Sequence, residues 1–549
     1  MYFQSNDRGR LLGMVNLNSI SIFIPACGGS RAFQDDLLRR LGGTTLIQRA
    51  VDKAISSGAP REQIFVLTNA EEIELISNRN GVKVVPIEGD LQACGLYMEV
   101  VAEKMRGLDV AVWLSPYAPG LKTETIIRAC DALLISDKQV LVPTQKRRYR
   151  VSNSSPVHLD KILMRPEAKS SWIESDAFTI FRKSALDYNS VVPTVSWEVG
   201  EDAFVINSLS DWWVCEKLLT RKRIIFRVVG NDEVGMGHIY RALTLAHEIT
   251  DHEVLFVSSE EDSIALNQLA GYDYWLGLYP SEEITNSILE LKPDLVVNDI
   301  LDTDKAYIKA LTDCGIKVVN FEDMGSGVVH ADLAINELYD DAMVQGGNVC
   351  WGRDYFFVRD EFADAIPHVF QEKVTGLLLT FGGTDQHDLS RKIYHVVKDL
   401  CRAHGVTIYI VAGPGYKEYQ HLVREVAKDD NVSVTHATGV ISSIMENTQL
   451  AITSNGRTVY ELAHMSIPSI VISQHDRERT HAFACEENGV IPLDLYREDI
   501  TEKRVLKVLE RLILDVEHRL NLFNSISRFE FSRNKAKVLN LMLSLLDKG

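Results

Sequence analysis

Short apolar runs rich in Val, Ile and Phe alternate with longer amphipathic segments from residue 20 onward. In the first third of the chain, the β-rich runs are 19–26, 63–70, 82–87, 110–116 and 139–144, and the helical patterns include 45–58 and 97–107. Strands that alternate with helices are typical of βαβ units, which build a parallel sheet. The pattern therefore predicts a doubly wound α/β domain in this part of the chain.

The same alternation begins again twice. A second series of predicted strands comprises 223–230, 253–259, 294–299, 316–323 and 332–336, and a third comprises 376–383, 407–413, 432–438, 450–454 and 469–473. We place the boundaries in the charged stretch near residue 220 and around residue 365. The predicted domains are 19–220, 221–365 and 366–549, after a leader at 1–18 whose start, MYFQSN, looks like the remnant of an expression tag. Two adjacent doubly wound domains favour a ligand cleft between them.

Composition narrows the functional classes. The 549 residues carry a formal net charge of −18, which argues against nucleic-acid binding, and the short basic run 145–150 reads as a solvated loop. No apolar run approaches the roughly 20 residues that span a bilayer, so we expect a cytoplasmic protein without a membrane span. The eight cysteines are scattered without a CxxC pair, which is typical of reduced thiols rather than of a disulfide frame or a zinc site.

A glycine turn with a histidine follows the first strand of the second series. Gly235 and Gly237 allow a tight turn and close approach of a ligand, and His238 then begins a helical pattern. Free N–H groups at a helix start favour an anion, and a histidine there can accept a proton at neutral pH. Taken alone, the spacing favours an ordinary capping turn whose histidine fills space.

Two further strand–glycine–helix elements lie downstream, at 380–392 and 453–463. Both suit nucleotide phosphates, although Ser and Asn are also ordinary helix caps. In the second element we expect Glu461 to bind the two hydroxyls of a ribose. The residues expected to face phosphate oxygens are Ser454, Asn455, Gly456 and Thr458.

Residues 223–500 resemble the metal-independent UDP-sugar hydrolase of the pseudaminic acid pathway, which is a glycosyltransferase-B-like enzyme. The resemblance rests on RVVGNDEVGMGHIYRALTLA, FEDMG followed by ADLAIN, WGRDYFFVRDEF, LLLTFGGTDQHDL and ITSNGRTVYELAHMSIPSIVIS. It implies that His238 is the catalytic residue and assists water in attacking the anomeric carbon, with UDP leaving. The substrate-binding residues that it implies are Gly235, Gly237, Asp299, Asn336, Gly382, Gly383, Thr384, Ser454, Asn455, Gly456, Thr458 and Glu461.

The chain departs from that family at two places. The family has an Asp-His-Tyr run after its third strand, whereas this chain has Asn298-Asp299-Ile300. The family's Asn-Gln pair is replaced within 473–483. The nucleotide framework is thus retained while the sugar contacts differ.

Residues 19–220 resemble CMP-sialic acid synthetases, a family of cytidylyltransferases. In the CTP loop, 26–43, the family's arginine and two lysines are replaced by Cys27, Arg31 and Asp36, and we expect the Asp36 carboxylate to repel a triphosphate. The family's metal-binding Asp-x-Asp becomes Val205 and Asn207, which leaves only Asp211 at a helix start. The vestigial nucleotide loop that this alignment gives consists of Cys27, Gly28, Gly29, Ser30 and Arg31.

The sequence thus predicts a degenerate cytidylyltransferase-like domain fused to a UDP-amino-sugar hydrolase of nonulosonic acid biosynthesis. A glycosyltransferase with a UDP-sugar donor and a non-catalytic nucleotide-sugar-binding scaffold stay open as alternatives. We expect a UDP-linked amino sugar as ligand, CTP or a CMP-sugar at most at the first domain, and neither a metal nor another cofactor unless that domain keeps its activity. Assembly into a homo-oligomer also stays open.

Overall fold

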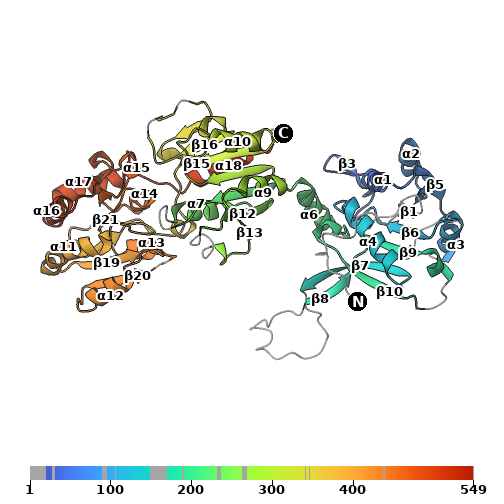
Figure 1. Ribbon diagram of the computed structural model, residues 1–549, viewed down its shortest axis with the longest axis horizontal. Helices are drawn as coiled ribbons and strands as arrows, with labels where there is room; N and C mark the ends of the chain where they lie inside the picture. The colour runs from blue at the N-terminus through green and yellow to red at the C-terminus, as the bar shows by residue number, and fades with distance from the viewer. Residues whose placement is uncertain are drawn as a thin grey trace. The chain divides into compact units, whose positions relative to one another are not determined.

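The computed structural model describes residues 20–27, 31–88, 95–105, 107–148, 170–187, 191–231, 236–262, 269–340, 342–344, 346–436 and 439–547. The chain divides between Arg221 and Lys222 into two compact units, each with its own sheets and core (Figure 1). This division lies beside the charged stretch near residue 220. The α/β class predicted from the alternating pattern is confirmed in both units.

The first unit is built on a mixed sheet with the strand order β10-β7-β9-β6-β1-β4-β5, and β8 pairs with β7. The prediction of a parallel sheet was wrong for two strands, because β9 lies antiparallel between β6 and β7, and β8 pairs antiparallel with β7. The strands are β1 (Ile20–Pro25), β4 (Ile64–Thr68), β5 (Lys83–Pro86), β6 (Val110–Leu114), β7 (Val140–Arg148), β8 (Ser170–Glu174), β9 (Phe178–Arg182) and β10 (Thr194–Glu198), with β2 (Arg40–Leu41) and β3 (Thr44–Thr45) as a separate pair.

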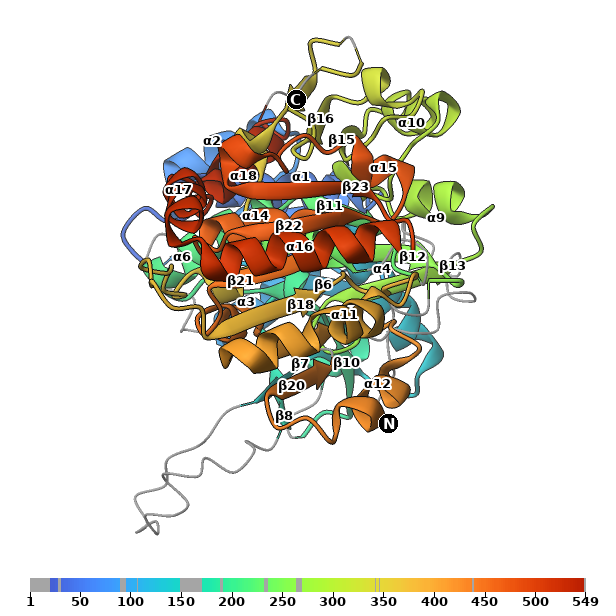
Figure 2. The same ribbon diagram turned by 90° about the vertical axis from the view of Figure 1, so that its left-hand side faces the viewer.

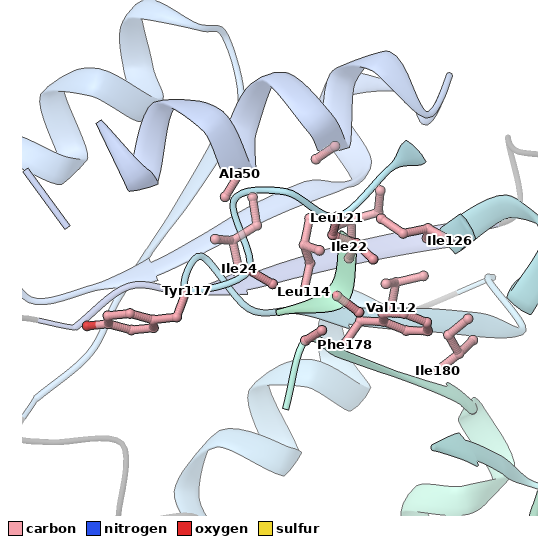
Figure 3. Packing of buried hydrophobic residues seen from close by; sticks show 14 of the residues in the cluster. Ile22, Ile24, Ala50, Val112, Leu114, Tyr117, Leu121, Ile126, Phe178 and Ile180 are labelled. Carbon is pink, nitrogen blue, oxygen red and sulfur yellow. The ribbon is translucent and has the colours of Figure 1, made fainter. Parts of the chain in front are cut away.

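Apolar side chains from the sheet and its covering helices form the core of this unit (Figure 3). Helix α1 begins where Thr45 accepts a hydrogen bond from the Gln48 N–H at 3.2 Å, and Ala50 on its buried face packs toward Ile22 and Ile24 of β1. The same cluster contains Phe178 of the antiparallel strand β9. The helices are α1 (Leu46–Ser56), α2 (Glu71–Arg79), α3 (Gly95–Lys104), α4 (Thr123–Ile135) and α6 (Leu209–Thr220).

The second unit begins with a lobe whose sheet is parallel throughout, in the order β13-β12-β11-β14-β15-β16-β17. The strands are β11 (Arg223–Val228), β12 (Glu253–Ser259), β13 (Trp275–Tyr279), β14 (Leu295–Asp299), β15 (Lys317–Phe321), β16 (Leu333–Asn336) and β17 (Val349–Trp351). The helices are α7 (Gly237–Ala246), α9 (Ile284–Glu290) and α10 (Lys305–Thr312).

The second lobe has another parallel sheet, in the order β20-β19-β18-β21-β22-β23, and Figure 2 looks onto it with α11 and α16 in front. The strands are β18 (Gly376–Thr380), β19 (Thr407–Ala412), β20 (Val432–His436), β21 (Leu450–Ser454), β22 (Ser469–Ser473) and β23 (Val490–Leu495). The helices are α11 (Leu389–His404), α12 (Tyr419–Val426), α13 (Ile441–Met445), α14 (Arg457–His464), α15 (Asp476–Arg479), α16 (Ile500–Leu514) and α17 (Val516–Ile526).

The last helix, α18 (Asn534–Leu543), returns to the first lobe. Its buried Val538 and Met542 pack in the same apolar cluster as Phe226 and Leu243 of that lobe. A linear division at residue 365 therefore leaves out one helix that completes the first lobe. Among the described helices, none combines the length and the apolar character that crossing a bilayer requires.

Candidate active site

In each lobe of the second unit, the first strand in sequence lies inside the sheet. Strand β11 has β12 on one side and β14 on the other, and β18 has β19 and β21. Connections that leave such a strand in opposite directions open a crevice at the carboxyl ends of the strands. The segments predicted from the sequence lie at the carboxyl ends of these two strands and of one neighbour of each. They are His238 after β11, Asp299 at the end of β14, the 382–384 turn after β18 and the 454–456 turn at the end of β21.

A cleft of about 380 Å³ lies at these strand ends, within the range typical of small-ligand sites. It brings together most of the residues that the sequence predicted for the site. The predicted residues that line the cleft are Gly237, His238, Gly382, Gly383, Thr384, Ser454, Gly456, Thr458 and Glu461. Gly235 lies outside the described residues.

Three predicted substrate-binding residues are buried outside the lining of the cleft. The side-chain amide of Asn336 bonds both the backbone N–H and the carbonyl of Asp323 at 2.9 Å. Asn455 donates from Nδ2 to the carbonyls of Glu478, at 2.7 Å, and His481, at 3.1 Å. The substrate-binding role predicted for Asn336, Asn455 and Asp299 stays a prediction, and the contacts shown for Asn336 and Asn455 are with backbone segments beside the cleft.

His238 lies in the first turn of α7, and its Nδ1 is 2.5 Å from Oδ1 of Asp299. Burial raises the pKa of Asp299, but Arg241 and His238 lower it more, so the carboxyl stays ionised and can only accept. The Nδ1–H of His238 is therefore the donor, and in the neutral form of the ring Nε2 carries the lone pair. Since His238 lines the cleft, this arrangement suits a general base.

The dyad belongs to a larger buried ion cluster. Arg241, which is 0% exposed, donates from Nε to Asp299 at 2.7 Å, and one of its terminal nitrogens forms an ion pair with Glu322 at 2.7 Å. It also bonds Glu337, which Arg457 bonds from the second lobe. Burial raises the pKa of Glu322, but the nearby basic groups, with Arg241 the strongest, together outweigh this effect and hold the pKa well below its usual range.

The ion cluster around His238 contains more carboxylates than guanidinium groups. The carboxylates of Asp299, Glu322 and Glu337 contact the two guanidinium groups of Arg241 and Arg457. Among these five side chains, the carboxylates outnumber the guanidinium groups by one.

The same group of side chains also has the composition of a metal site. In the described part of the chain, His238, Asp299 and Glu322 place ligand atoms within 4.8 Å of one another. Arg241 already hydrogen bonds to Asp299 and forms an ion pair with Glu322 at 2.7 Å. The guanidinium supplies the positive charge, so this donor set fits an arginine better than a divalent cation.

Two glycine turns of the second lobe also line the cleft. Helix α14 begins directly after Gly456, and both Gly456 and Arg457 line the cleft, so the start of this helix borders it. Gly382 has a φ of 79°, which favours glycine, and a side chain on Gly413 would meet the carbonyl oxygens of Gly382 and Gly383 at 2.4 and 2.3 Å. These glycines let two turns approach each other at the site.

Glu461 lines the cleft and is held by Arg359, which donates from Nε to Oε1 at 2.8 Å and from a terminal nitrogen to Oε2 at 3.3 Å. Arg359 also pairs with Glu361 at 2.9 Å. Each oxygen of Glu461 keeps further acceptor capacity. The carboxylate is therefore fixed in place and can still accept hydrogen bonds from a diol.

Sequence reasoning missed most of the charged residues of the site. Arg241 lies three residues after His238 on one helix, and this spacing places both on the same face, which is a signal that the sequence contained. Glu322 has a φ of 50°, a left-handed conformation that is costly for a residue other than glycine and that no local pattern indicated. The other missed residues are Glu337, Arg359, Arg457, Arg477, Glu478 and His481.

In the first unit, Gly28, Gly29 and Ser30 lie outside the described residues, and Cys27 is buried. The expectation that Asp36 faces a triphosphate was wrong. Asp36 is 2% exposed and accepts hydrogen bonds from the backbone N–H groups of Arg31 and Ala32, at 3.1 and 3.0 Å, and from the Tyr117 hydroxyl at 3.0 Å. The N–H groups are satisfied within the loop, and the Arg31 side chain pairs with Asp176 at 2.5 Å.

Residues 377–536, which form most of the second lobe, match the glycosyltransferase family 28 C-terminal domain. An uncharacterized protein of Methanocaldococcus jannaschii is 25% identical over 53% of this chain and 61% of its own length. The spore coat polysaccharide biosynthesis protein SpsG of Bacillus subtilis is 24% identical over 53% of this chain and 89% of its own length. The UDP-2,4-diacetamido-2,4,6-trideoxy-beta-L-altropyranose hydrolase of Campylobacter jejuni is 29% identical over 31% of this chain and 64% of its own length.

This chain thus spans less than two thirds of the first and third of these relatives. Among solved structures, MurG of Acinetobacter baumannii is 13% identical with a TM-score of 0.44, over 59% of this chain and 99% of that one. A CMP:2-keto-3-deoxy-manno-octonic acid synthetase is 13% identical with a TM-score of 0.29, over 37% of this chain and 98% of that one. The match with a defined family is therefore that of residues 377–536 with the glycosyltransferase family 28 C-terminal domain.

Proposed function

We propose that the second unit hydrolyses a UDP-linked amino sugar in nonulosonic acid biosynthesis, with water attacking the anomeric carbon and UDP leaving. The observation that carries this proposal is the His238–Asp299 dyad, at 2.5 Å, which borders the same cleft as the glycine turns of the second lobe. The similarity to a hydrolase of a UDP-diacetamido sugar supports the choice of substrate class.

In the proposed reaction, Nε2 of His238 takes a proton from water as its oxygen bonds to the anomeric carbon. The bond between that carbon and the diphosphate oxygen breaks, and its electron pair leaves with UDP. Asp299 stabilises the imidazolium that forms. The N–H groups at the start of α14 and the turn at Gly382 stabilise the charge that develops on the diphosphate, while Glu461 binds the ribose hydroxyls.

A glycosyltransferase is the second candidate, because residues 377–536 match a glycosyltransferase domain and SpsG is named for polysaccharide biosynthesis. In that reaction His238 would take its proton from an acceptor hydroxyl instead of water. Fold does not separate the two reactions, since the activity depends on the site.

For the first unit, we infer that it does not transfer a nucleotide by the route of cytidylyltransferases. In the described part of the loop, the N–H groups of Arg31 and Ala32 are bonded to Asp36, and the Arg31 side chain is paired with Asp176. Asp211 bonds Ser208 Oγ and the Asn207 N–H, both at 2.9 Å, as part of the α6 cap. These contacts support a structural rather than a catalytic part for the unit.

The test is turnover of a UDP-2,4-diacetamido-2,4,6-trideoxyhexose in ¹⁸O-labelled water, with and without EDTA. We expect UDP release in both conditions, with the label in the free sugar. His238→Asn should reduce kcat by about 10²–10⁴-fold, as for loss of a general base, and leave UDP affinity unchanged.

Release of UDP only when a sugar acceptor is added, without label from water, would establish the transferase instead. A loss of activity in EDTA would contradict the assignment of Arg241 as the cation of the site. If His238→Asn unfolds the protein, as circular dichroism would show, the histidine is structural.

A further inference from the structure

His481 lies on the wall of the cleft and is fixed by the turn that precedes α14. Its Nδ1 is 2.6 Å from the carbonyl oxygen of Asn455, while the side chain of Asn455 donates back to the His481 carbonyl at 3.1 Å. The ring also packs edge-on against Tyr339, with centroids 5.3 Å apart. These contacts leave the imidazole a single orientation in the cleft wall.

The contact with Asn455 determines where the ring carries its proton. A carbonyl oxygen can only accept, so Nδ1 of His481 must be the donor. Burial lowers the pKa of His481, although nearby Glu322 opposes the shift, so the ring is neutral at pH 7. The opposite ring nitrogen, Nε2, is therefore a lone-pair acceptor.

Nothing in the described part of the chain satisfies this acceptor. His481 is 8% exposed, and Nε2 is buried without a hydrogen-bond partner. An unsatisfied buried polar atom costs about 1–3 kcal/mol, and native structures keep few of them. A buried acceptor at the edge of a ligand cleft indicates that the ligand supplies the donor.

The chemistry of the acceptor identifies which part of the ligand it meets. Ionised phosphate oxygens carry no proton to donate and would be repelled by a lone pair. His481 is tied to the 454–456 turn on one side and lies close enough to Glu322 to influence its pKa on the other. It therefore lies between the 454–456 turn and the His238 cluster, where the sugar would sit.

We propose that His481 is a specificity-determining residue, whose Nε2 accepts a hydrogen bond from a hydroxyl or an acylamino N–H of the UDP-linked sugar. The proposal rests on the proposed function, because it takes UDP to occupy the second lobe. It adds a requirement on the sugar: a donor group must reach the ring edge opposite Asn455. Sugars that lack this donor bind no more tightly than UDP alone.

The test uses His481→Asn, because the asparagine amide can still donate to the Asn455 carbonyl but has no counterpart of Nε2. Calorimetry compares UDP with UDP-N-acetylglucosamine as the probe. We expect an unchanged affinity for UDP and a loss of about 5- to 50-fold for the sugar nucleotide, as for one lost hydrogen bond. His395→Asn, at an exposed histidine of α11 outside the cleft, is the matched control.

A second measurement, by NMR, follows the His481 ring in the unaltered protein and does not depend on ligand binding by the variant. In protein labelled with ¹⁵N-histidine, the His481 signals are assigned by their absence in His481→Asn. The Nε2 signal should show an unprotonated nitrogen in free protein, stay unchanged with UDP, and shift toward the protonated range with UDP-N-acetylglucosamine.

The outcomes separate the two proposals. If UDP does not bind the unaltered protein, the nucleotide assignment falls and the role of His481 falls with it. If UDP binds while His481→Asn changes neither ligand's affinity, or changes both equally, the proposed function stands and His481 is structural. A protonated Nε2 in the free protein, or a signal insensitive to the sugar nucleotide, also overturns the proposal.

Discussion

Glu478 is a buried carboxyl on the cleft wall whose charge depends on pH near neutrality. Its Oε2 accepts a hydrogen bond from the Gln474 N–H at 2.6 Å. Burial raises the pKa of Glu478 from 4.5 to about 7, although hydrogen bonds from Gln474 and Asn455 oppose the shift. In the native protein this carboxyl therefore holds its proton over a range where the unfolded chain has lost it.

This difference predicts a stability loss with rising pH. The contribution of Glu478 is fully present below pH 4.5 and is lost as the pH rises to about 7. At about 1.4 kcal/mol per pKa unit, the loss is on the order of 3 kcal/mol. We expect Glu478→Gln, which keeps the oxygen that accepts from Gln474, to remove this part of the pH dependence.

The measurement is the free energy of unfolding of the second unit, from urea denaturation between pH 4.5 and 8. The exposed Glu510 on α16 provides the control substitution, Glu510→Gln, which should follow the unaltered protein. If Glu478→Gln and the unaltered protein have the same pH slope, the carboxyl is ionised throughout.

At the level of single residues, the sequence revealed the turns and not the charges between them. His238, Gly382 and Gly456 were found because a glycine turn before a helix is a local signal. Glu322 and Glu337 follow the ends of β15 and β16, far along the chain from Arg241, with which both form ion pairs. No spacing rule connects such positions, because the sheet order alone brings them together.

Among the elements, the start of α14 is the one whose backbone is expected to bind the ligand. Gly456 precedes this helix with a φ of −119°, which any residue can adopt. A side-chain carbon added there meets no atom of the described chain within 4 Å and would project into open space at the cleft. A methyl group at position 456 therefore fits the free protein, but we expect it to occupy space that a bound diphosphate needs.

Gly456→Ala should therefore fold normally and lose UDP. We expect an unchanged thermal midpoint and a decrease in UDP affinity of about tenfold or more, equal to about 1.4 kcal/mol. Gly347→Ala, at a glycine with equally open surroundings outside the cleft, should leave both quantities unchanged. Calorimetric titration with UDP decides the matter, and equal affinities for the two variants would exclude α14 as the diphosphate site.

The alternation of strands and helices along the chain was predicted from the sequence. Some individual strands, and the directions of strands within the sheets, were not. The strongly apolar runs that became β11, β14 and β18 were found, because buried parallel strands are nearly continuous in hydrophobicity. Strand β23 was missed, since its VIPLDL carries a proline and an aspartate. The antiparallel direction of β9 could not be predicted, because side-chain alternation is the same in both directions.

In the second unit as a whole, the chain crosses from one lobe to the other twice. It leaves the first lobe before β18 and returns to it with α18, whose Met542 is fully buried there. Each lobe is therefore held to the other by two passages of covalent chain as well as by the contact of Arg457 with Glu337.

This connectivity predicts that damage at α18 reaches the first lobe. Met542→Ala should lower the free energy of unfolding of the second unit by about 2–5 kcal/mol, as for a buried methionine. Asn540→Ala, at an exposed position of the same helix, should have little effect. Differential scanning calorimetry measures both, and an unchanged transition in Met542→Ala would show that α18 is dispensable.

The return of α18 to the first lobe also determines when that lobe can complete its folding during translation. Strands β11 to β17 are synthesised long before residue 534. The apolar surface that α18 covers in the first lobe therefore stays exposed while about two hundred further residues are made. Chaperones and proteases meet the lobe in that interval. The helix made last therefore acts as the closing step of folding for a lobe made much earlier.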